Sequence, residues 1–234
     1  MSYINDIDFG EDYLRWMRTC ERVRNFSTVE LESMQDEIVK NNDSALAYFF
    51  ASDFGYKSYK MQKVILDNKN PQYAFLFAKN IHNSDSKALQ NLIFDSKNIK
   101  YIAKFACFIH NSDYKKAQKL LLNSKNIKYI SLFLKHCKNA DYKSLKNIII
   151  KSGKPKYLLQ LAKKCKLKKD ITVIQNLIIK SGSSRYIRLF AQFIKLADQA
   201  KLEEAIIELG DICEIKKFAK MVKGSKLANF KLSL

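Results

Sequence analysis

Residues 99–126 read IKYIAKFACFIHNSDYKKAQKLLLNSKN, and residues 127–154 read IKYISLFLKHCKNADYKSLKNIIIKSGK. The two stretches are copies of one pattern that is about 28 residues long. Further copies, some degenerate, extend outward from them over 71–98, 155–183 (with one residue inserted), 184–211, 43–70 and 15–42, and a last unit begins at 212. A fixed period of this length is typical of repeat proteins, in which each copy is one structural unit.

Each copy divides into two amphipathic segments. The first carries a tyrosine, an aromatic residue four positions later and then a small residue, as in Tyr101, Phe105 and Ala106, which is an apolar stripe at helical spacing. The second segment follows an aspartate, which predicts a helix N-cap at Asp85, Asp113, Asp141, Asp170 and Asp198. Glycines that suit a left-handed helix end follow it at Gly153, Gly182 and Gly210. The pattern predicts two helices in each unit.

The fold class that follows is all-α, specifically an α-solenoid of seven to eight stacked units. One helix pair cannot bury both of its faces, whereas stacked pairs bury a continuous core. With two prolines and six glycines in 234 residues, the composition also disfavours a loop-rich β-protein. We expect a single domain over 1–234, with an acidic N-terminal capping unit at 1–42, repeats over 43–211 and a truncated unit at 212–234.

The pattern Y-I-x-x-F-A…A-D-x-x-x-L-Q-x-x-I-I-x-S-G resembles that of tandem α-helical repeat proteins of AT-rich bacteria, phages and large DNA viruses. The resemblance covers most of the chain, from about Arg15 to Phe230. The architecture is more loosely similar to that of HEAT-type solenoids. The resemblance implies the helical-repeat fold, and it implies no activity, cofactor or site residue.

The five cysteines are widely spaced and form no C-x-x-C pair, which predicts reduced thiols and a cytoplasmic, reducing location. The first residues do not form a signal or transit peptide, and no apolar run approaches the roughly 18–20 residues of a membrane span. The three histidines fit no zinc spacing, and no Gly-rich phosphate loop occurs. We therefore expect no membrane, metal or small-molecule cofactor.

The net charge of +19 is spread unevenly. Three consecutive units, 99–126, 127–154 and 155–183, have 6, 7 and 7 Lys and Arg residues and one Asp each, which gives +5, +6 and +6. Residues 1–42, in contrast, have 5 basic and 9 acidic residues. A sustained positive field of this kind favours a polyanion as ligand.

Stacked repeats bring equivalent positions into rows, and two lysine rows and a glutamine row recur. The residues predicted to bind nucleic acid are Lys87, Lys100, Lys115, Lys119, Lys128, Lys143, Lys146, Lys156, Arg185, Gln90, Gln118 and Gln175. Ammonium and amide groups in rows suit phosphates and polar base edges. The function predicted is non-enzymatic binding of nucleic acid or another polyanion.

Several alternatives remain open at this point. The lysines are equally explained as solvating charge, since 36 of the 42 basic residues are lysine and phosphate-binding proteins are often richer in arginine. The glutamines are equally explained as solvated side chains or as ties between neighbouring helices. The tyrosine row (Tyr73, Tyr101, Tyr129, Tyr157 and Tyr186) invites base stacking, but core packing with the hydroxyl at the surface is favoured.

Two other functions compete with polyanion binding. A protein–protein scaffold with an acidic partner is the common use of solenoid grooves. A DNA glycosylase of the HEAT-like type is the weaker alternative, because the carboxylates of residues 99–183 (Asp113, Asp141 and Asp170) are all expected to cap helices. General acid–base catalysis needs a titratable group that is not already engaged. No catalytic residue is therefore predicted.

Overall fold

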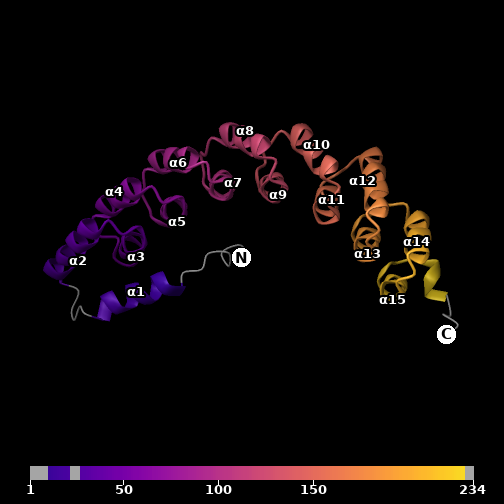
Figure 1. Ribbon diagram of the computed structural model, residues 1–234, viewed down its shortest axis with the longest axis horizontal. Coiled ribbons are helices and arrows are strands. Elements are labelled where there is room, and N and C mark those ends of the chain that lie inside the picture. The colour runs from indigo at the N-terminus through magenta and orange to yellow at the C-terminus, as the bar shows by residue number, and fades with distance from the viewer. Residues whose placement is uncertain (1–9, 22–26, 230–234) are drawn as a thin grey trace. The chain divides into compact units, whose positions relative to one another are not determined.

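The computed structural model describes residues 10–21 and 27–229 of the chain, and these residues form helices without any strand (Figure 1). The α-helices are α1 (Gly10–Glu21), α2 (Thr28–Asn41), α3 (Ser44–Phe54), α4 (Ser58–Asn68), α5 (Pro71–Asn80), α6 (Ser86–Asp95), α7 (Ile99–Phe108), α8 (Tyr114–Ser124), α9 (Ile127–His136), α10 (Tyr142–Ser152), α11 (Pro155–Ala162), α12 (Lys168–Lys180), α13 (Ser184–Phe193), α14 (Gln199–Glu208) and α15 (Ile212–Met221). A short 3₁₀ helix, η1 (Lys226–Asn229), follows them. The all-α class is confirmed.

Each complete repeat from 43 to 211 contains two helices, as its sequence pattern predicts. The odd-numbered helices from α3 to α13 are the first of each pair and the even-numbered helices from α4 to α14 are the second. The last predicted unit has α15 and η1 in its described part. Parts of the predicted capping unit (1–9 and 22–26) and of the last unit (230–234) lie outside the described residues.

The chain falls into two compact units, residues 1–120 and 121–234, with the boundary inside α8. In the first unit, α3 contacts α4 and α5, and α5 contacts α6 and α7. In the second unit, α9 contacts α10 and α11, α11 contacts α12 and α13, and α13 contacts α14 and α15. Within each unit the first helices lie in one row and the second helices in another (Figure 1). This arrangement is compatible with a helical repeat.

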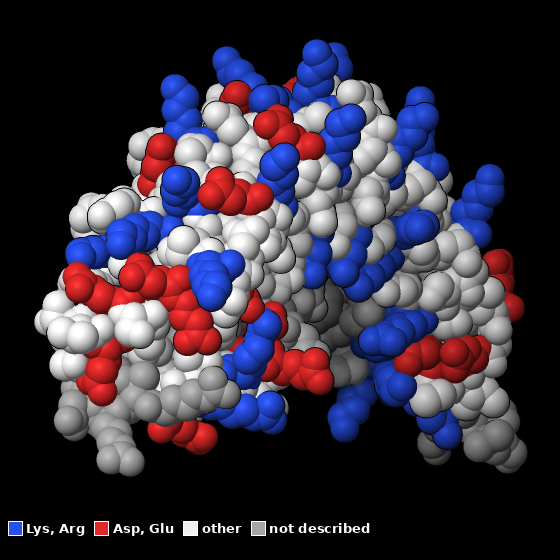
Figure 2. Space-filling view, turned by 60° about the vertical axis from the view of Figure 1, so that its left-hand side comes forward, with Lys and Arg blue, Asp and Glu red and all other residues white. Residues whose placement is uncertain are grey.

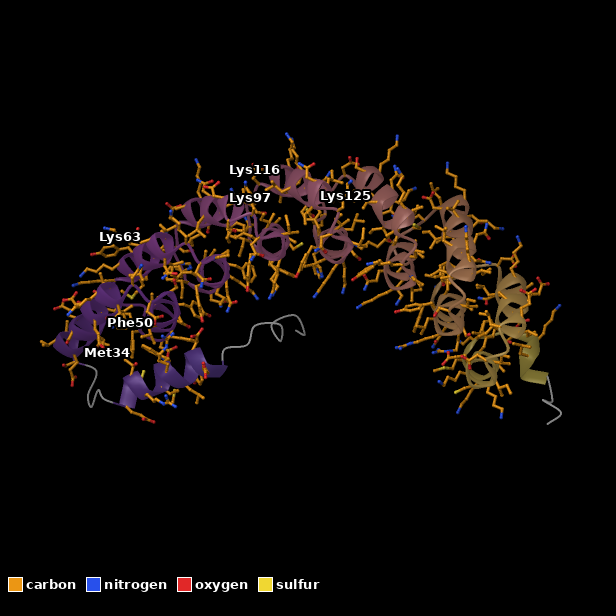
Figure 3. The ribbon with its side chains drawn as sticks, in the orientation of Figure 1. Met34, Phe50, Lys63, Lys97, Lys116 and Lys125 are labelled. Carbon is orange, nitrogen blue, oxygen red and sulfur yellow. The ribbon has the colours of Figure 1, made fainter. Side chains whose placement is uncertain are left out.

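The core of each unit is built from residues that recur at equivalent repeat positions. One phenylalanine in most of the first helices is fully or almost fully buried, and these residues are Phe50, Phe77, Phe105, Phe133, Phe190 and Phe218. Two aliphatic positions of the second helices are equally buried, as with Leu145 and Ile149 in α10. Met34 and Phe50 point between the helices of the first unit (Figure 3). Repetition of the apolar stripe thus produces a row of buried rings.

The predicted helix caps are confirmed at four of the five aspartates. Asp85, Asp141 and Asp198 are N-caps whose carboxylates accept backbone N–H groups, and Asp113 accepts from the N–H of Lys116 at 2.9 Å. The prediction was wrong for Asp170, which lies in the first turn of α12, after an N-cap at Leu167 without a side-chain cap bond. The residue inserted in this repeat lets the helix begin before the aspartate.

The helix ends at Gly153, Gly182 and Gly210 have left-handed backbone, with φ of 62°, 65° and 68°. The left-handed closing residue that the sequence predicts is therefore confirmed. Three earlier repeats place a lysine at this position: Lys69, Lys97 and Lys125 have φ of 57°, 54° and 52°. A side chain with a Cβ atom is strained in this conformation.

The acidic N-terminal helix α1 packs against α3. The Trp16 side chain is 1% exposed, and its Nε1–H donates to Oδ2 of Asp53 at 2.8 Å. Arg15 forms an ion pair with Asp43 at 2.7 Å, and the Tyr73 hydroxyl donates to Asp12. The only tryptophan of the sequence therefore anchors α1 on the first unit.

Across the described residues, none of the helices combines the length and the apolar character needed to cross a lipid bilayer.

Candidate functional site

The charge of the protein is concentrated in the second unit. Residues 121–234 contain 25 Lys and Arg against 8 Asp and Glu, a net +17, whereas residues 1–120 contain 17 against 15, a net +2. In the first unit, acidic side chains gather over the N-terminal helices, at the left of the view in Figure 2. The net positive charge is therefore much greater in the second unit than in the first.

Within the second unit, the first helices α9, α11 and α13 contain no Asp or Glu. We define the basic face as five of the exposed cationic side chains on these helices or at their ends: Lys128, Lys135, Lys156, Lys163 and Arg185. Because α11 contacts both α9 and α13, the three helices form one continuous surface of the unit.

The geometry of the α-helix explains why these side chains share a face. Lys128 and Lys135 are seven residues apart, as are Lys156 and Lys163, and this spacing of two turns returns to the same side of a helix. The opposite side carries the buried Phe133 in α9. Burial of the aromatic stripe therefore turns the lysines outward.

Four cations of the basic face form no ion pair with a carboxylate among the described residues: Lys128, Lys156, Lys163 and Arg185. Three of them lie over aromatic rings: the Nζ atoms of Lys128, Lys156 and Lys163 are 5.6, 5.9 and 4.3 Å from the ring centres of Tyr129, Tyr157 and Phe193, respectively. Such contacts position an ammonium group without neutralising its charge. The charges remain available for a ligand.

Lys135 and Lys163 were missing from the predicted site. The signal was in the sequence, because lysine also recurs at position nine of the repeat, at Lys79, Lys135, Lys163 and Lys220. Comparing residues two turns apart on one helix would have identified this second row.

The predicted lysines of the second helices have different surroundings. Lys87, Lys115, Lys119 and Lys143 are exposed on α6, α8 and α10. Lys146 is engaged inside the protein, since its Nζ pairs with Oδ1 of Asp170 at 2.9 Å and both side chains are under 20% exposed. Asp170 is the one aspartate of residues 99–183 that does not cap a helix, and this ion pair engages it. We therefore leave Lys146 out of the basic face.

The glutamine row ties successive repeats together. Gln90 Oε1 accepts from the N–H of Asp113 at 2.7 Å, and Gln62 makes the same contact with Asp85 at 2.9 Å. Gln175, 2% exposed, accepts from the N–H of Asp198 at 2.9 Å and donates to its carbonyl at 3.0 Å. Glu203, at the same repeat position, accepts from the N–H of Lys226 at 2.9 Å.

These contacts leave Gln90 and Gln175 with structural roles, and we do not retain them as ligand-binding residues. Gln118, at the same repeat position, is also engaged in an interaction. Of the interpretations of the glutamine row that the sequence left open, ties between neighbouring helices are the one that the hydrogen bonds support.

In the first unit, the tyrosine row packs in the core, as the sequence predicts. Tyr73 and Tyr101 are 3% and 4% exposed, and the Tyr101 hydroxyl donates to Oε1 of Gln72 at 2.6 Å. Burial and the contact with Asp12 hold the pKa of Tyr73 above its usual range. Tyr129, Tyr157 and Tyr186 are half-buried. Base stacking on Tyr73 or Tyr101 is excluded by their burial.

Within the described ranges, no three His, Cys, Asp or Glu residues come close enough to hold a metal ion. Burial, together with Lys135 and Lys164, lowers the pKa of His136. Burial also raises the pKa of the Cys165 thiol, which lies 2.9 Å from the Tyr142 hydroxyl. These thiol and imidazole groups are therefore neutral at pH 7.

No protein-family model matches this sequence, and neither a curated protein nor a solved structure matches the chain.

Proposed function

We propose that the chain is an α-solenoid that binds a polyanion, with nucleic acid as the favoured ligand, through the basic face of its second unit. The observation that carries the proposal is that three contacting helices, α9, α11 and α13, present five exposed cations and no carboxylate. Phosphate groups repel carboxylates and pair with Lys and Arg, so such a surface favours a phosphate backbone.

The solenoid part of the proposal is supported by three recurring contacts. First helices contact the next first helices within each unit, one phenylalanine position stays buried in successive repeats, and the glutamine ties reach from one repeat to the next. Each repeat therefore depends on its neighbour for burial and for satisfied hydrogen bonds, which is how solenoids are stabilised.

The proposed activity is binding without a catalysed reaction. Asp141 accepts hydrogen bonds from the backbone of α10 and from Ser144, and Asp170 pairs with Lys146. The Ser144 hydroxyl and the backbone N–H groups lower the pKa of Asp141, so its carboxylate is charged at neutral pH and cannot act as an acid there. Neither group is suited to the role of a general acid.

The decisive experiment compares two triple charge reversals of equal net charge. One changes the basic face (Lys128→Glu, Lys156→Glu, Arg185→Glu), and the other changes exposed second-helix lysines (Lys87→Glu, Lys115→Glu, Lys119→Glu). The dissociation constant for a labelled single-stranded DNA is measured over a salt series. We expect the first variant to bind about tenfold more weakly or worse, and to reduce the salt slope by roughly 2 for three lost phosphate contacts.

The second variant should bind the DNA more weakly only because its net charge is lower. Its loss of affinity should therefore be smaller than that of the first variant. Absence of binding by the unmodified protein at low salt would remove the polyanion proposal altogether. Equal losses in the two variants would show that binding depends on net charge and not on the basic face.

A further inference from the structure

A cleft of about 420 Å³ opens among α9, α10 and α11 of the second unit. Its apolar lining comes from Leu134, Ile149 and Leu161, all of them buried core residues. Pockets of this size with a mostly apolar lining and a few fixed polar groups are typical sites for small organic groups. The cleft lies between the helices that carry the basic face.

The polar side of the cleft is built by a pair of neutral side chains and by lysines. The Ser131 hydroxyl, 5% exposed, donates to Oε1 of Gln160 at 2.6 Å, and the Gln160 amide nitrogen donates to no other described residue. Lys164 is fixed at the end of α9, because its Nζ donates to the carbonyls of Leu134 at 2.9 Å and Lys135 at 2.7 Å. Lys135 and Lys163 complete a lining that has no acidic residue.

An exposed aromatic ring lies next to this cleft. Phe193, at the end of α13, is 49% exposed, and the Nζ of Lys163 lies 4.3 Å from its ring centre. Lys163 therefore belongs both to the cleft lining and to a cation–aromatic pair on the neighbouring helix. An exposed ring beside cations is the arrangement on which unpaired bases stack.

The serine–glutamine pair is particular to this cleft. The position of Ser131 is Ala103 in α7, and the position of Gln160 is Leu132 in α9 and Leu189 in α13. Apolar residues therefore suit these positions in several first helices, although Arg188 in α13 and Lys104 in α7 also occupy them, so the fold does not require this particular serine–glutamine pair. The Gln160 amide N–H groups, which no described residue accepts, are left for a ligand.

We propose that the cleft and Phe193 bind unpaired bases of a single-stranded nucleic acid whose phosphates lie along the basic face. This inference rests on the proposed function and adds that the nucleic acid is single-stranded. A base offers a planar apolar body with donors and acceptors at its edge, and it is flanked by phosphates, which matches the cleft and its lysines. Bases in a duplex are stacked and paired, so they cannot enter.

The test uses two probes of matched charge: a 12-nucleotide single strand with a central 2-aminopurine, and inorganic polyphosphate as the ligand without bases. The variants are Ser131→Ala/Gln160→Leu, which introduces the residues of equivalent positions, and Phe193→Ala. The control is Tyr59→Ala, which removes an exposed aromatic residue (68% exposed) from α4. Circular dichroism confirms the helix content of each variant.

We expect the unmodified protein to bind the strand about tenfold more tightly than polyphosphate, because stacking and edge contacts add to the phosphate contacts. Both site variants should reduce strand binding by about five- to tenfold, abolish the 2-aminopurine fluorescence change and leave polyphosphate binding unchanged, since no charge is altered. Tyr59→Ala should change neither affinity.

The inference is overturned if strand and polyphosphate bind equally well, or if the site variants leave strand binding and fluorescence unchanged while the basic face still binds polyphosphate. That outcome would preserve the proposed function. Failure of both probes to bind, in contrast, would overturn the proposed function itself.

Discussion

At the scale of single residues, the left-handed lysines show how the repeat tolerates local strain. Lys97 and Lys125 occupy the repeat position that Gly153 fills with the same backbone conformation. Both are exposed and lie between the end of one helix and the start of the next (Figure 3). A positive charge near the C-terminal end of a helix interacts favourably with the helix dipole, which partly offsets the strain.

We therefore expect Lys97→Gly or Lys125→Gly to raise the free energy of unfolding by about 0.5–1 kcal/mol, because glycine removes the left-handed strain and its greater unfolded-state entropy only partly cancels the gain. The control is Lys119→Gly, inside α8, which should lower stability by about 1 kcal/mol. Urea denaturation measures both effects. A loss of stability in Lys97→Gly would contradict the strained backbone.

At the scale of helices, the glutamine ties connect elements that belong to successive repeats. Gln175 satisfies both the N–H and the carbonyl of Asp198, the residue that caps α14. We expect Gln175→Leu to lower the free energy of unfolding by about 1–3 kcal/mol, because two backbone groups lose their partner. The control is Asn176→Leu at the neighbouring, exposed position of α12, with an expected change within about 0.5 kcal/mol. Equal losses of stability in Gln175→Leu and Asn176→Leu would show that the hydrogen bonds of Gln175 do not stabilise the fold.

A buried ion pair connects α13 with α15. Arg188 Nε lies 2.6 Å from Oε2 of Glu214, and Lys217 Nζ lies 2.8 Å from Oε1. Burial by itself raises the pKa of Glu214, but the hydrogen bonds from Lys217 and Arg188 outweigh it, so the pKa is lowered. A carboxyl group with a lowered folded-state pKa stabilises the fold above its unfolded pKa of about 4.3, and this contribution is lost as the pH falls through the folded pKa.

We expect Glu214→Ala to lower stability at pH 7 by roughly 3–5 kcal/mol, because it leaves the buried Arg188 charge without its partner. The difference between the variant and the unmodified protein should shrink as the pH is lowered from 7 to below the unfolded pKa of about 4.3, because the carboxyl group then takes up its proton. Thermal unfolding over this pH range measures the difference, with the exposed Glu204→Ala as control. A stability difference between Glu214→Ala and the unmodified protein that does not change with pH would contradict the lowered pKa of Glu214.

At the scale of the whole molecule, charge and packing follow different patterns along the chain. The buried phenylalanine position and the glutamine ties recur in both units, whereas the positive charge is concentrated in residues 121–234. Packing therefore uses the repeat throughout, whereas the proposed ligand uses only the basic face, which lies in the more strongly charged unit. The salt-series comparison of the two triple variants tests this separation, because it changes the same number of charges in each place.

The amino-acid sequence by itself determined the helices and most of their ends, because the apolar stripe, the capping aspartates and the closing glycines act within a few residues of one another. It also determined which units carry the charge. The N-cap predicted at Asp170 was wrong, because one residue is inserted in this repeat and α12 begins before the aspartate. The role of the glutamines could not be assigned from the sequence, because their hydrogen-bond partners lie 23 residues away.

Only the tertiary structure decided which cations share a surface. Lys146 and Lys128 look alike in the sequence, yet Lys146 pairs with an aspartate from the next repeat and Lys128 stays exposed on α9. The cleft likewise requires side chains from three helices, and the contact of Lys163 with Phe193 joins residues 30 positions apart. The physical reason is that periodicity specifies the direction of a side chain on its own helix, whereas its partners depend on how neighbouring helices pack.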